Sequence, residues 1–355
     1  MDRYKIDSHK LMYHVSRVHK WNNGDVTYPI YMELSPAGSC NHRCTYCGLD
    51  FMGYKPRQLD TVLLKERLLE LGELGIKSIM YAGEGEPFLH KDMPEIIRYT
   101  RESGIDAAVT TNAVFFENKI AEDVVRDSKW IKVSINGATR QTYSRIHSCG
   151  QEDFNKVIKN MSYAAEIREK NNYSCALGMQ LLLLPENQHE AADLAELAAE
   201  IGMDYLVIKP YSQHPQSKTT IYESIKYNDY AYLEDELAHF NTDKFSVIFR
   251  TRTMKKWDQK THDYKACLAL PFWSYIDASG NVWGCSMYLG NKNFLYGNIY
   301  EETFKEIWEG EKRRKSLHWV EKELDVAQCR VNCRMDEINR YLWTLKNPLE
   351  HVNFI

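Results

Sequence analysis

Short apolar runs alternate with longer amphipathic segments through the first 210 residues of the chain. Six runs have the length and composition of buried strands: 30–34, 78–81, 107–110, 131–135, 176–184 and 205–208. The segments between them repeat apolar positions at the helical period, over 60–73, 91–102, 118–127, 151–170 and 188–200. Strands that alternate with helices are typical of a parallel sheet covered by crossover helices. The pattern therefore predicts an α/β fold built on this region.

The pattern changes on both sides of this region, which suggests four segments. Residues 1–27 are polar and mildly helical, so we expect an N-terminal extension beside the main domain of 28–210. Residues 211–262 interrupt the alternation with polar turns, a helix near 229–240 and a strand-like run at 245–249, which predicts a connector. The remaining residues, 263–355, carry a second group of cysteines and form a small C-terminal domain in this interpretation.

Composition and charge narrow the class of protein. The 355 residues suffice for one large domain and a smaller one, and the net charge of −4 gives no basic footprint for nucleic acid or an anionic membrane. The longest aliphatic run, 181–184, is far shorter than the ~20 residues that cross a bilayer. Nine cysteines without a recognisable export signal indicate a reducing, cytoplasmic location.

Three of the cysteines share one short loop directly after the first strand-like run. Cys40, Cys44 and Cys47 have the spacing C-x3-C-x2-C, at the end of a strand where α/β folds place their chemistry. Three thiolates satisfy three irons of a 4Fe–4S cluster and leave the fourth iron open to a small molecule. The alternative is zinc, which prefers four N/S ligands in a closed tetrahedron, and only His42 is near enough in sequence to be the fourth.

This loop resembles the signature of the radical S-adenosylmethionine (radical SAM) superfamily. The resemblance implies that SAM chelates the open iron and that one electron splits it into methionine and a 5′-deoxyadenosyl radical. It also implies a partial (β/α)6 TIM-like barrel and a low-potential electron donor such as flavodoxin or ferredoxin. Tyr46, just before the third thiol, matches the aromatic residue that lies near the adenine in that family.

Other strand ends carry residues that resemble SAM contacts of the family. Residues 82–87, Ala-Gly-Glu-Gly-Glu-Pro, resemble its Gly-Gly-Glu-Pro segment, in which backbone exposed by Gly85 and the carboxylate of Glu86 accept hydrogen bonds from the SAM amino group. A plain Gly/Pro turn is the alternative. Ser134 and Asn136 point the same way from the fourth strand, towards the SAM carboxylate or ribose, although an Asn-Gly turn explains Asn136 equally well.

Two further polar residues belong to the same predicted layer. Asn112 ends the third strand, but Ala113 stands where the family often has glycine, which weakens a specific role for Asn112. Gln180, on the fifth strand, is a polar residue near several leucines and is placed to reach the adenosine. A buried side chain of this type needs a hydrogen-bond partner.

The second group of cysteines comprises Cys267, Cys285, Cys329 and Cys333. The hairpin-like sequence that leads to Cys285 resembles the SPASM or twitch domains with which radical SAM enzymes hold auxiliary clusters. Four cysteines match a twitch-type α+β domain with one fully ligated second 4Fe–4S cluster, suited to electron transfer or to shaping the substrate site. A four-cysteine zinc site is the alternative, because its ligand number is also right.

Residues near the predicted barrel mouth are candidates for the remaining chemistry. Arg145 and His147 follow the fourth strand, and Lys209 follows the sixth, together with Tyr211 and His214. Each is a candidate base or anion clamp, although a solvated or structural role is the common alternative for each alone.

The leftover thiols bear on a different reaction. Cys149 and Cys175 belong to neither group, and a thiol can donate a hydrogen atom to a substrate radical. Their alternative is to be small buried hydrophobes.

The leading hypothesis is a radical SAM oxidoreductase that acts on a small sugar or aminocyclitol and oxidises a carbinol, with the auxiliary cluster as electron acceptor. Three alternatives stay open. The first is a SPASM-type maturase that modifies a peptide or protein. The second is a redox-neutral sugar epimerase or dehydratase. The third is a zinc-bearing structural or nucleic-acid-binding protein.

Overall fold

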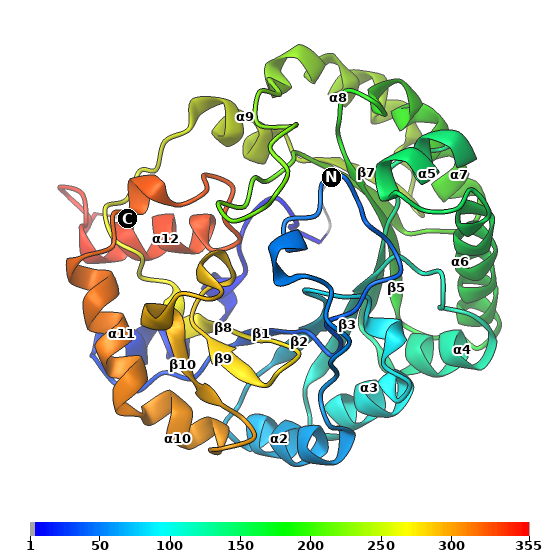
Figure 1. The fold of residues 1–355 in the computed structure, drawn as a ribbon. Helices are drawn as coiled ribbons and strands as arrows, with labels where there is room; N and C mark the ends of the chain where they lie inside the picture. Colours follow the sequence, from blue (N-terminus) through cyan, green and yellow to red (C-terminus); the bar gives the residue numbers. More distant parts are fainter. Residues whose placement is uncertain (1–3, 355) are drawn as a thin grey trace.

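A single ten-stranded sheet organises the chain, which a computed structural model describes over residues 4–354. Its strand order is β10-β9-β8-β1-β2-β3-β4-β5-β6-β7, and β1 to β8 run parallel while β9 and β10 are antiparallel. Figure 1 shows the sheet curved into an open barrel with helices around its outside. The strands are β1 Tyr31–Leu34, β2 Ser78–Tyr81, β3 Asp106–Thr111, β4 Trp130–Ser134, β5 Ala176–Leu182, β6 Tyr205–Lys209, β7 Ser246–Phe249, β8 Trp273–Ile276, β9 Asn281–Trp283 and β10 Leu295–Asn298.

The helices α2 to α7 connect the parallel strands and cover the outer face of the sheet (Figure 1). The helices are α1 Val15–Asn22, α2 Thr61–Glu73, α3 Met93–Glu102, α4 Asn118–Asp127, α5 Arg140–His147, α6 Glu152–Lys170, α7 Ala191–Glu200, α8 Tyr232–Glu236, α9 Thr251–Gln259, α10 Phe304–Glu309, α11 Glu311–Lys322 and α12 Asp336–Lys346. The predicted α/β class, the six strands and the helices between them are confirmed. The short helix α5 was not predicted.

Alternation along the strands separates the hydrophobic core from the inside of the barrel. In β4, Ile131 and Val133 are fully buried in the core between sheet and helices. Trp130, Lys132 and Ser134 point to the opposite face, because successive side chains of a strand alternate. The outer face is therefore apolar, while the inner face is free to carry polar chemistry.

The sheet does not stop at the six predicted strands. β7, from the segment predicted as a connector, pairs with β6, with Ile208 opposite Phe249. β8, from the C-terminal region, pairs with the other edge of the barrel, with Leu34 opposite Ile276. Both additions satisfy backbone groups that an edge strand would leave unpaired. Neither run continues the regular alternation of strands and helices that identifies the first six strands, so the sequence alone does not assign it to this sheet.

A cavity of about 810 Å³ lies inside the barrel. Part of its lining comes from the N-terminal extension, including Tyr4, His9 and Leu11. The ring of Tyr4 lies 5.2 Å from the ring of Tyr205 at the start of β6, and Asp7 accepts a hydrogen bond of 3.0 Å from Arg250. The extension was predicted beside the main domain, and its described residues, from Tyr4 on, also reach the cavity and contact β6.

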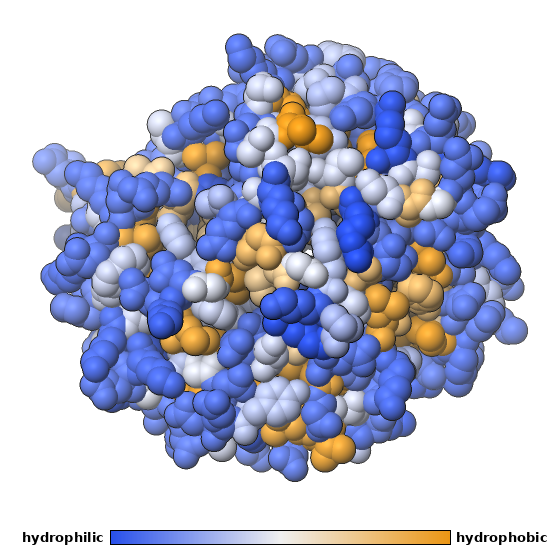
Figure 2. All heavy atoms as spheres, viewed as in Figure 1, coloured by the Kyte–Doolittle hydropathy of each residue, from blue (hydrophilic) through white to orange (hydrophobic). Residues whose placement is uncertain are grey.

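Within the described residues, no helix combines the length and the apolar character needed to cross a membrane. On the face shown in Figure 2, hydrophobic side chains form small patches that hydrophilic side chains separate.

We expect Gly178→Ala to lower the free energy of unfolding by about 1–3 kcal/mol, the usual effect of overpacking. A Cβ at this β5 position would lie 2.1 Å from the ring of Tyr205, which is itself buried and packed against Tyr4. Denaturant unfolding followed by circular dichroism measures the change. The control is Gly150→Ala, where a Cβ meets nothing within 4 Å. Equal stability of both variants would contradict the tight packing at Gly178.

Candidate active site between two groups of cysteines

The loop of Cys40, Cys44 and Cys47 follows β1 and is pinned by the loop after β2. The backbone N–H of Glu86 donates to the carbonyl of Ser39 at 2.9 Å. A Cβ at Gly85 would lie 2.4 Å or less from the carbonyl oxygens of Ser39 and Ala37. Glycine at this position therefore permits a backbone contact that any side chain would prevent.

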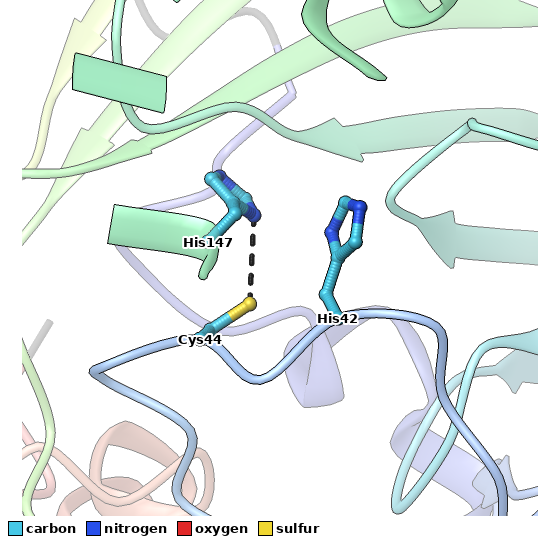
Figure 3. A group of neighbouring side chains, drawn as sticks. All are labelled: His42, Cys44 and His147. Carbon is cyan, nitrogen blue, oxygen red and sulfur yellow. Dashed lines mark hydrogen bonds between the residues drawn. The ribbon is translucent and has the colours of Figure 1, made fainter. Parts of the chain in front are cut away.

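The helix α5 holds the other side of the same loop. The backbone N–H of Thr45 donates to the carbonyl of Ile146 at 2.9 Å, and that of Arg43 donates to the carbonyl of His147 at 3.2 Å. The side chain of His147 reaches Cys44, with 3.5 Å between Nδ1 and Sγ (Figure 3). The loop is thus fixed between a strand end and a helix end before any cofactor is considered.

The protonation of His147 follows from its second neighbour. The backbone N–H of Asn136 donates to Nε2 of His147 at 3.2 Å, so Nε2 carries the lone pair and Nδ1 carries the hydrogen. Burial lowers the pKa of His147 well below its usual value, so the ring is neutral. His147 therefore donates an N–H hydrogen bond to the sulfur of Cys44.

His42, Cys44 and His147 lie close enough to share one metal ion, with their candidate ligand atoms within 4.8 Å of one another (Figure 3). A protonated Nδ1 cannot bind a metal, however, and Nε2 of His147 is occupied by Asn136. His42 is tied through its Nε2 to a carboxylate oxygen of Asp153 at 3.1 Å. The two histidines therefore fit a supporting role around the thiols better than a role as ligands.

The three thiols fit an iron–sulfur cluster. Burial raises the pKa of Cys40 to about 11 and that of Cys44 well above its usual value, while Cys47 shifts in the same direction. Thiolates in such surroundings need a positive partner, which iron ions supply. The backbone N–H of His42 also points to the sulfur of Cys40 at 3.5 Å, a hydrogen bond of the kind that cluster thiolates accept.

Glu86 uses its carboxylate to join the ends of two strands. It accepts hydrogen bonds from the hydroxyl of Thr111 at 2.5 Å, the backbone N–H of Asn112 at 2.8 Å and that of Phe88 at 3.1 Å. Burial raises the pKa of Glu86 to about 6, against the effect of these donors. Glu86 thus shapes the site, and its predicted contact with SAM stays a prediction.

Glu84, two residues earlier, was not predicted to have a function. Its carboxylate bonds Arg57 and accepts the backbone N–H of Ala278 at 2.7 Å, which links the barrel to the C-terminal hairpin. The only signal in the sequence is its place inside the Gly-Glu-Gly-Glu-Pro segment.

The other predicted SAM contacts lie around the same strand ends. Asn112 donates through Nδ2 to Asn41 in the cysteine loop at 2.7 Å, and Ala113 adopts the left-handed backbone conformation with φ of 60°, which glycine adopts more readily. The side chain of Asn136 accepts the backbone N–H of Leu182 at 2.7 Å. Both asparagines therefore have structural partners.

Tyr46, Ser134 and Gln180 complete this set. The ring of Tyr46 meets that of His147 edge-on, with 5.7 Å between the ring centres. Ser134 and Gln180 are partners in the β4–β5 register, and Gln180 lines the cavity. Their contacts with SAM remain predictions.

The four C-terminal cysteines gather from three segments of the chain. Cys267 precedes β8, Cys285 follows β9, and Cys329 and Cys333 precede α12. Burial, followed by the charges of the neighbouring thiols Cys333 and Cys329, raises the pKa of Cys267 to about 12. Hydrogen-bond donors surround the sulfurs, for example the N–H of Met335 to Cys333 at 3.4 Å.

The spacing of these sulfurs bears on the zinc alternative. Of the described residues, no three of the four cysteines bring their sulfurs within 4.8 Å of one another. A tetrahedral zinc ion with Zn–S bonds of about 2.3 Å holds its sulfurs within about 4 Å of each other. The wider spacing favours a multi-iron cluster, whose ligands bind different metal ions.

Residues 211–218 bridge the two groups of cysteines. The hydroxyl of Ser217 donates to the carbonyl of Cys47 at 3.2 Å. His214, which stacks on Phe51, bonds the carbonyl of Ser286 at 3.1 Å, and Asn332 donates to the carbonyl of Tyr211 at 2.8 Å. Sequence reasoning placed Tyr211 and His214 at the barrel mouth but gave no signal for this bridge.

The structure separates the three predicted catalytic candidates. Arg145 points to the exposed side of α5 and donates to the carbonyl of Glu186 at 3.4 Å. His147 lies under Cys44. Lys209 lines the cavity, and burial followed by the charge of Lys132 lowers its pKa well below the usual value. Lys209 is therefore the candidate of the three that faces a space for substrate.

The leftover thiols do not line the cavity as far as the described residues go. Cys175 is buried in the core, and burial raises its pKa to about 12. Cys149 lies beside α5, and its pKa is also raised to about 12 by burial. Neither position favours hydrogen-atom donation to a substrate in the barrel.

Comparisons with known proteins match the two groups of cysteines to two families. A sequence profile of the radical SAM superfamily matches residues 34–198, and one of the SPASM iron–sulfur cluster-binding domain matches residues 267–334.

Curated relatives match mostly in part. A GTP 3′,8-cyclase of Chlorobaculum tepidum is 25% identical over 52% of this chain and 55% of its own length. A probable GTP 3′,8-cyclase of Metallosphaera sedula is 31% identical over 47% of this chain and 51% of its own. This chain thus spans about half the length of these two relatives. An AdoMet-dependent heme synthase of Methanosarcina barkeri is 26% identical over 76% of this chain and 79% of its own length.

Solved structures support the fold. Streptococcus suis SuiB has a TM-score of 0.63 and 17% identity, with 84% of this chain and 69% of that chain covered. The enzyme anSMEcpe with bound AdoMet has a TM-score of 0.59 and 17% identity, over 90% of this chain and 95% of that one.

We predict that His147→Phe makes the midpoint potential of the N-terminal cluster more negative. The phenyl ring keeps the packing but removes the N–H donor to Cys44, and such a donor stabilises the extra negative charge of a reduced cluster. Anaerobic redox titration monitored by electron paramagnetic resonance measures the potential. The C-terminal cluster is the internal control, and its potential should stay unchanged. An unchanged N-terminal potential would contradict the hydrogen bond.

We predict that the double variant Cys329→Ser/Cys333→Ser loses about four iron ions per chain while it retains the N-terminal cluster. Both thiols belong to the C-terminal group alone, far in sequence from Cys40. Iron, sulfide and zinc analysis of anaerobically purified protein provides the measurement. Loss of about one zinc ion with the iron content unchanged would support the zinc alternative instead.

Proposed function

We propose that this chain, which belongs to the radical SAM superfamily and carries a C-terminal SPASM iron–sulfur domain, oxidises a small polar metabolite inside its barrel. The chain binds SAM and 4Fe–4S clusters, with Cys40, Cys44 and Cys47 around the SAM site and the four C-terminal cysteines around the auxiliary site in this proposal. When bound, these groups supply a 5′-deoxyadenosyl radical that takes a hydrogen atom from the substrate and an acceptor for the electron that remains.

The observation that carries the proposal is the position of the cavity. Its lining includes Thr110, Gln180 and Lys209 from the barrel strands, and also Asn332 and Cys333 from the C-terminal domain. A volume of about 810 Å³ is in the range of small-molecule sites. A substrate in this cavity would lie directly beside a ligand of the auxiliary cluster, where an electron can leave it.

Lys209 is placed to take the hydroxyl proton of a carbinol. Burial, followed by the charges of Lys132 and Arg250, lowers its pKa well below the usual value, which favours the neutral amine that a base requires. The hydrogen atom, the proton and the electron together make the loss of two electrons that turns a carbinol into a ketone.

We also propose a cytoplasmic enzyme that receives electrons from flavodoxin or ferredoxin. All nine cysteines are free thiols in the described structure, which suits a reducing compartment.

A peptide substrate is the second candidate. The structural neighbours include SuiB bound to its precursor peptide SuiA and anSMEcpe with a bound peptide. Their identity of about 17% carries the fold and leaves the substrate class of this chain to experiment. A redox-neutral epimerase has less support, because Cys149 and Cys175 are not among the cavity-lining residues.

The test uses anaerobically reconstituted enzyme with SAM, dithionite and three substrate panels: sugars and their phosphates, aminocyclitols, and short peptides. We expect a product two hydrogen atoms lighter, formed in equal amount with 5′-deoxyadenosine and detected by mass spectrometry. A product of unchanged oxidation level that takes up deuterium from heavy water would contradict oxidation and indicate epimerisation. Turnover of peptides alone would support the second candidate.

We predict that Lys209→Met lowers the turnover of that substrate by roughly 10²–10⁴-fold, the usual contribution of a general base. The variant should still form 5′-deoxyadenosine in the absence of substrate, because Lys209 does not position the thiols of either cysteine group. The matched control is Arg145→Met, whose guanidinium bonds a carbonyl on the outer side of α5. Equal turnover by wild type and Lys209→Met would remove Lys209 from the mechanism.

A further inference from the structure

Basic side chains converge on the cavity from several segments of the chain. Lys132 lies on β4, Lys209 on β6, and Arg250 directly after β7. The loop that holds Cys329 and Cys333 contributes Arg330 and Arg334. Such a concentration of like charge inside a barrel is unfavourable unless something of opposite charge faces it.

Two of these five basic side chains already have acidic partners. Arg250 bonds Asp7 at 3.0 Å, and Arg334 bonds Glu33 at 2.9 Å. The other acid that lines the cavity, Glu337, bonds Lys256 and Arg252. The acids that line the cavity, Glu33 and Glu337, are therefore paired with basic residues outside the other three of this group.

Lys132, Lys209 and Arg330 have no acidic partner among the described residues. Lys132 lies over the ring of Trp130, with 5.5 Å from Nζ to the ring centre, and the carboxylate of Glu33, which bonds Arg334, acts on it only through charge. The Nε of Arg330 is buried and makes no hydrogen bond within the described protein. Unpaired groups of this kind point to a ligand that completes them.

The electrostatics agree with this geometry. Burial, followed by the charges of Arg334 and Arg250, lowers the pKa of Lys132 to about 7. Burial and the neighbouring cations thus both disfavour the charged form of Lys132, and a bound anion would stabilise that form.

We infer that the substrate carries a phosphate group, which Lys132 and Arg330 bind inside the barrel while Lys209 beside them serves the reacting carbon. This inference rests on the proposed function, because it takes the cavity as the substrate site. Arginine and lysine together are the usual partners of phosphate, and two unpaired cations match its double charge. The neutral groups of Thr110, Gln180 and Asn332 in the same lining suit sugar hydroxyls.

The position of Lys132 separates it from most of the predicted SAM contacts, of which Gln180 lines the same cavity. Lys132 precedes Ser134 by two residues on β4, which places it roughly 6–7 Å further from the carboxyl end of the strand. Glu86, Asn112 and Asn136 do not belong to the described lining of the cavity. Lys132 therefore lies deeper in the barrel than Ser134, while Lys209 at the end of β6 and Arg330 beside Cys329 line the same cavity.

The experiment measures binding rather than turnover. Anaerobic holoenzyme is dialysed to equilibrium against radiolabelled inorganic phosphate or pyrophosphate. Parallel dialyses use succinate, which shows whether the site prefers a carboxylate, and SAM, which shows whether the SAM site is intact. We expect phosphate or pyrophosphate to bind, succinate to bind more weakly, and Lys132→Met to weaken phosphate binding at least tenfold. Lys132→Arg should retain binding, and Lys156→Met, an exposed lysine on α6, should match wild type.

Iron content and SAM affinity show whether Lys132→Met has folded. If it has not, phosphate binding by Lys132→Arg, which keeps the positive charge, provides the comparison with wild type. Loss of SAM binding together with phosphate binding would overturn the inference, because the cations would then hold the SAM carboxylate. Tighter binding of succinate, or equal phosphate binding by Lys132→Met, would also overturn it.

The two proposals fail separately. Phosphate binding that depends on Lys132, in an enzyme that oxidises no sugar phosphate, would support the anion site and contradict the proposed oxidation. Oxidation of an uncharged sugar by an enzyme that binds no phosphate would support the proposed oxidation and contradict the anion site.

Discussion

Hydrogen bonds from neighbouring elements to the backbone of one loop are the constraint on which this structure depends. The loop of Cys40, Cys44 and Cys47 has little structure of its own, so its shape comes from the end of β2 on one side and the end of α5 on the other. Gly85 allows the first contact, and Asn136 orients His147 for the second. The loop after β2 also carries Glu86, so the protein itself builds the surroundings of the thiols.

The sequence predicted the features that appear as a regular pattern in the chain, which are the period of apolar residues and the spacing of cysteines. The six apolar runs and the helices between them are confirmed, and profile matches confirm a radical SAM domain over residues 34–198 and a SPASM domain over residues 267–334. These features are local: a strand shows its apolar run, and a cysteine loop shows its spacing. The roles assigned to single residues remain predictions, because no comparison tests them.

The features that sequence reasoning missed depend on contacts between distant residues. Nothing around Glu84 signals its bond to Ala278, which is 194 positions away. His147 looked like a candidate for the barrel mouth because it follows a strand, but α5, which carries it, turns the ring towards Cys44. The net charge of −4 gives no sign of this group of basic side chains, because its five members come from four separate places in the chain.

β1 is an interior strand, with β2 on one edge and β8 on the other. The strand that leads to the first cysteine group is therefore hydrogen-bonded to the strand that starts the C-terminal domain. The two domains share a backbone ladder rather than a flexible hinge, so the separation of the two cysteine groups is set when the protein folds. Heat or denaturant that frees the C-terminal domain must break this ladder as well, so we expect the two domains to unfold as one cooperative unit.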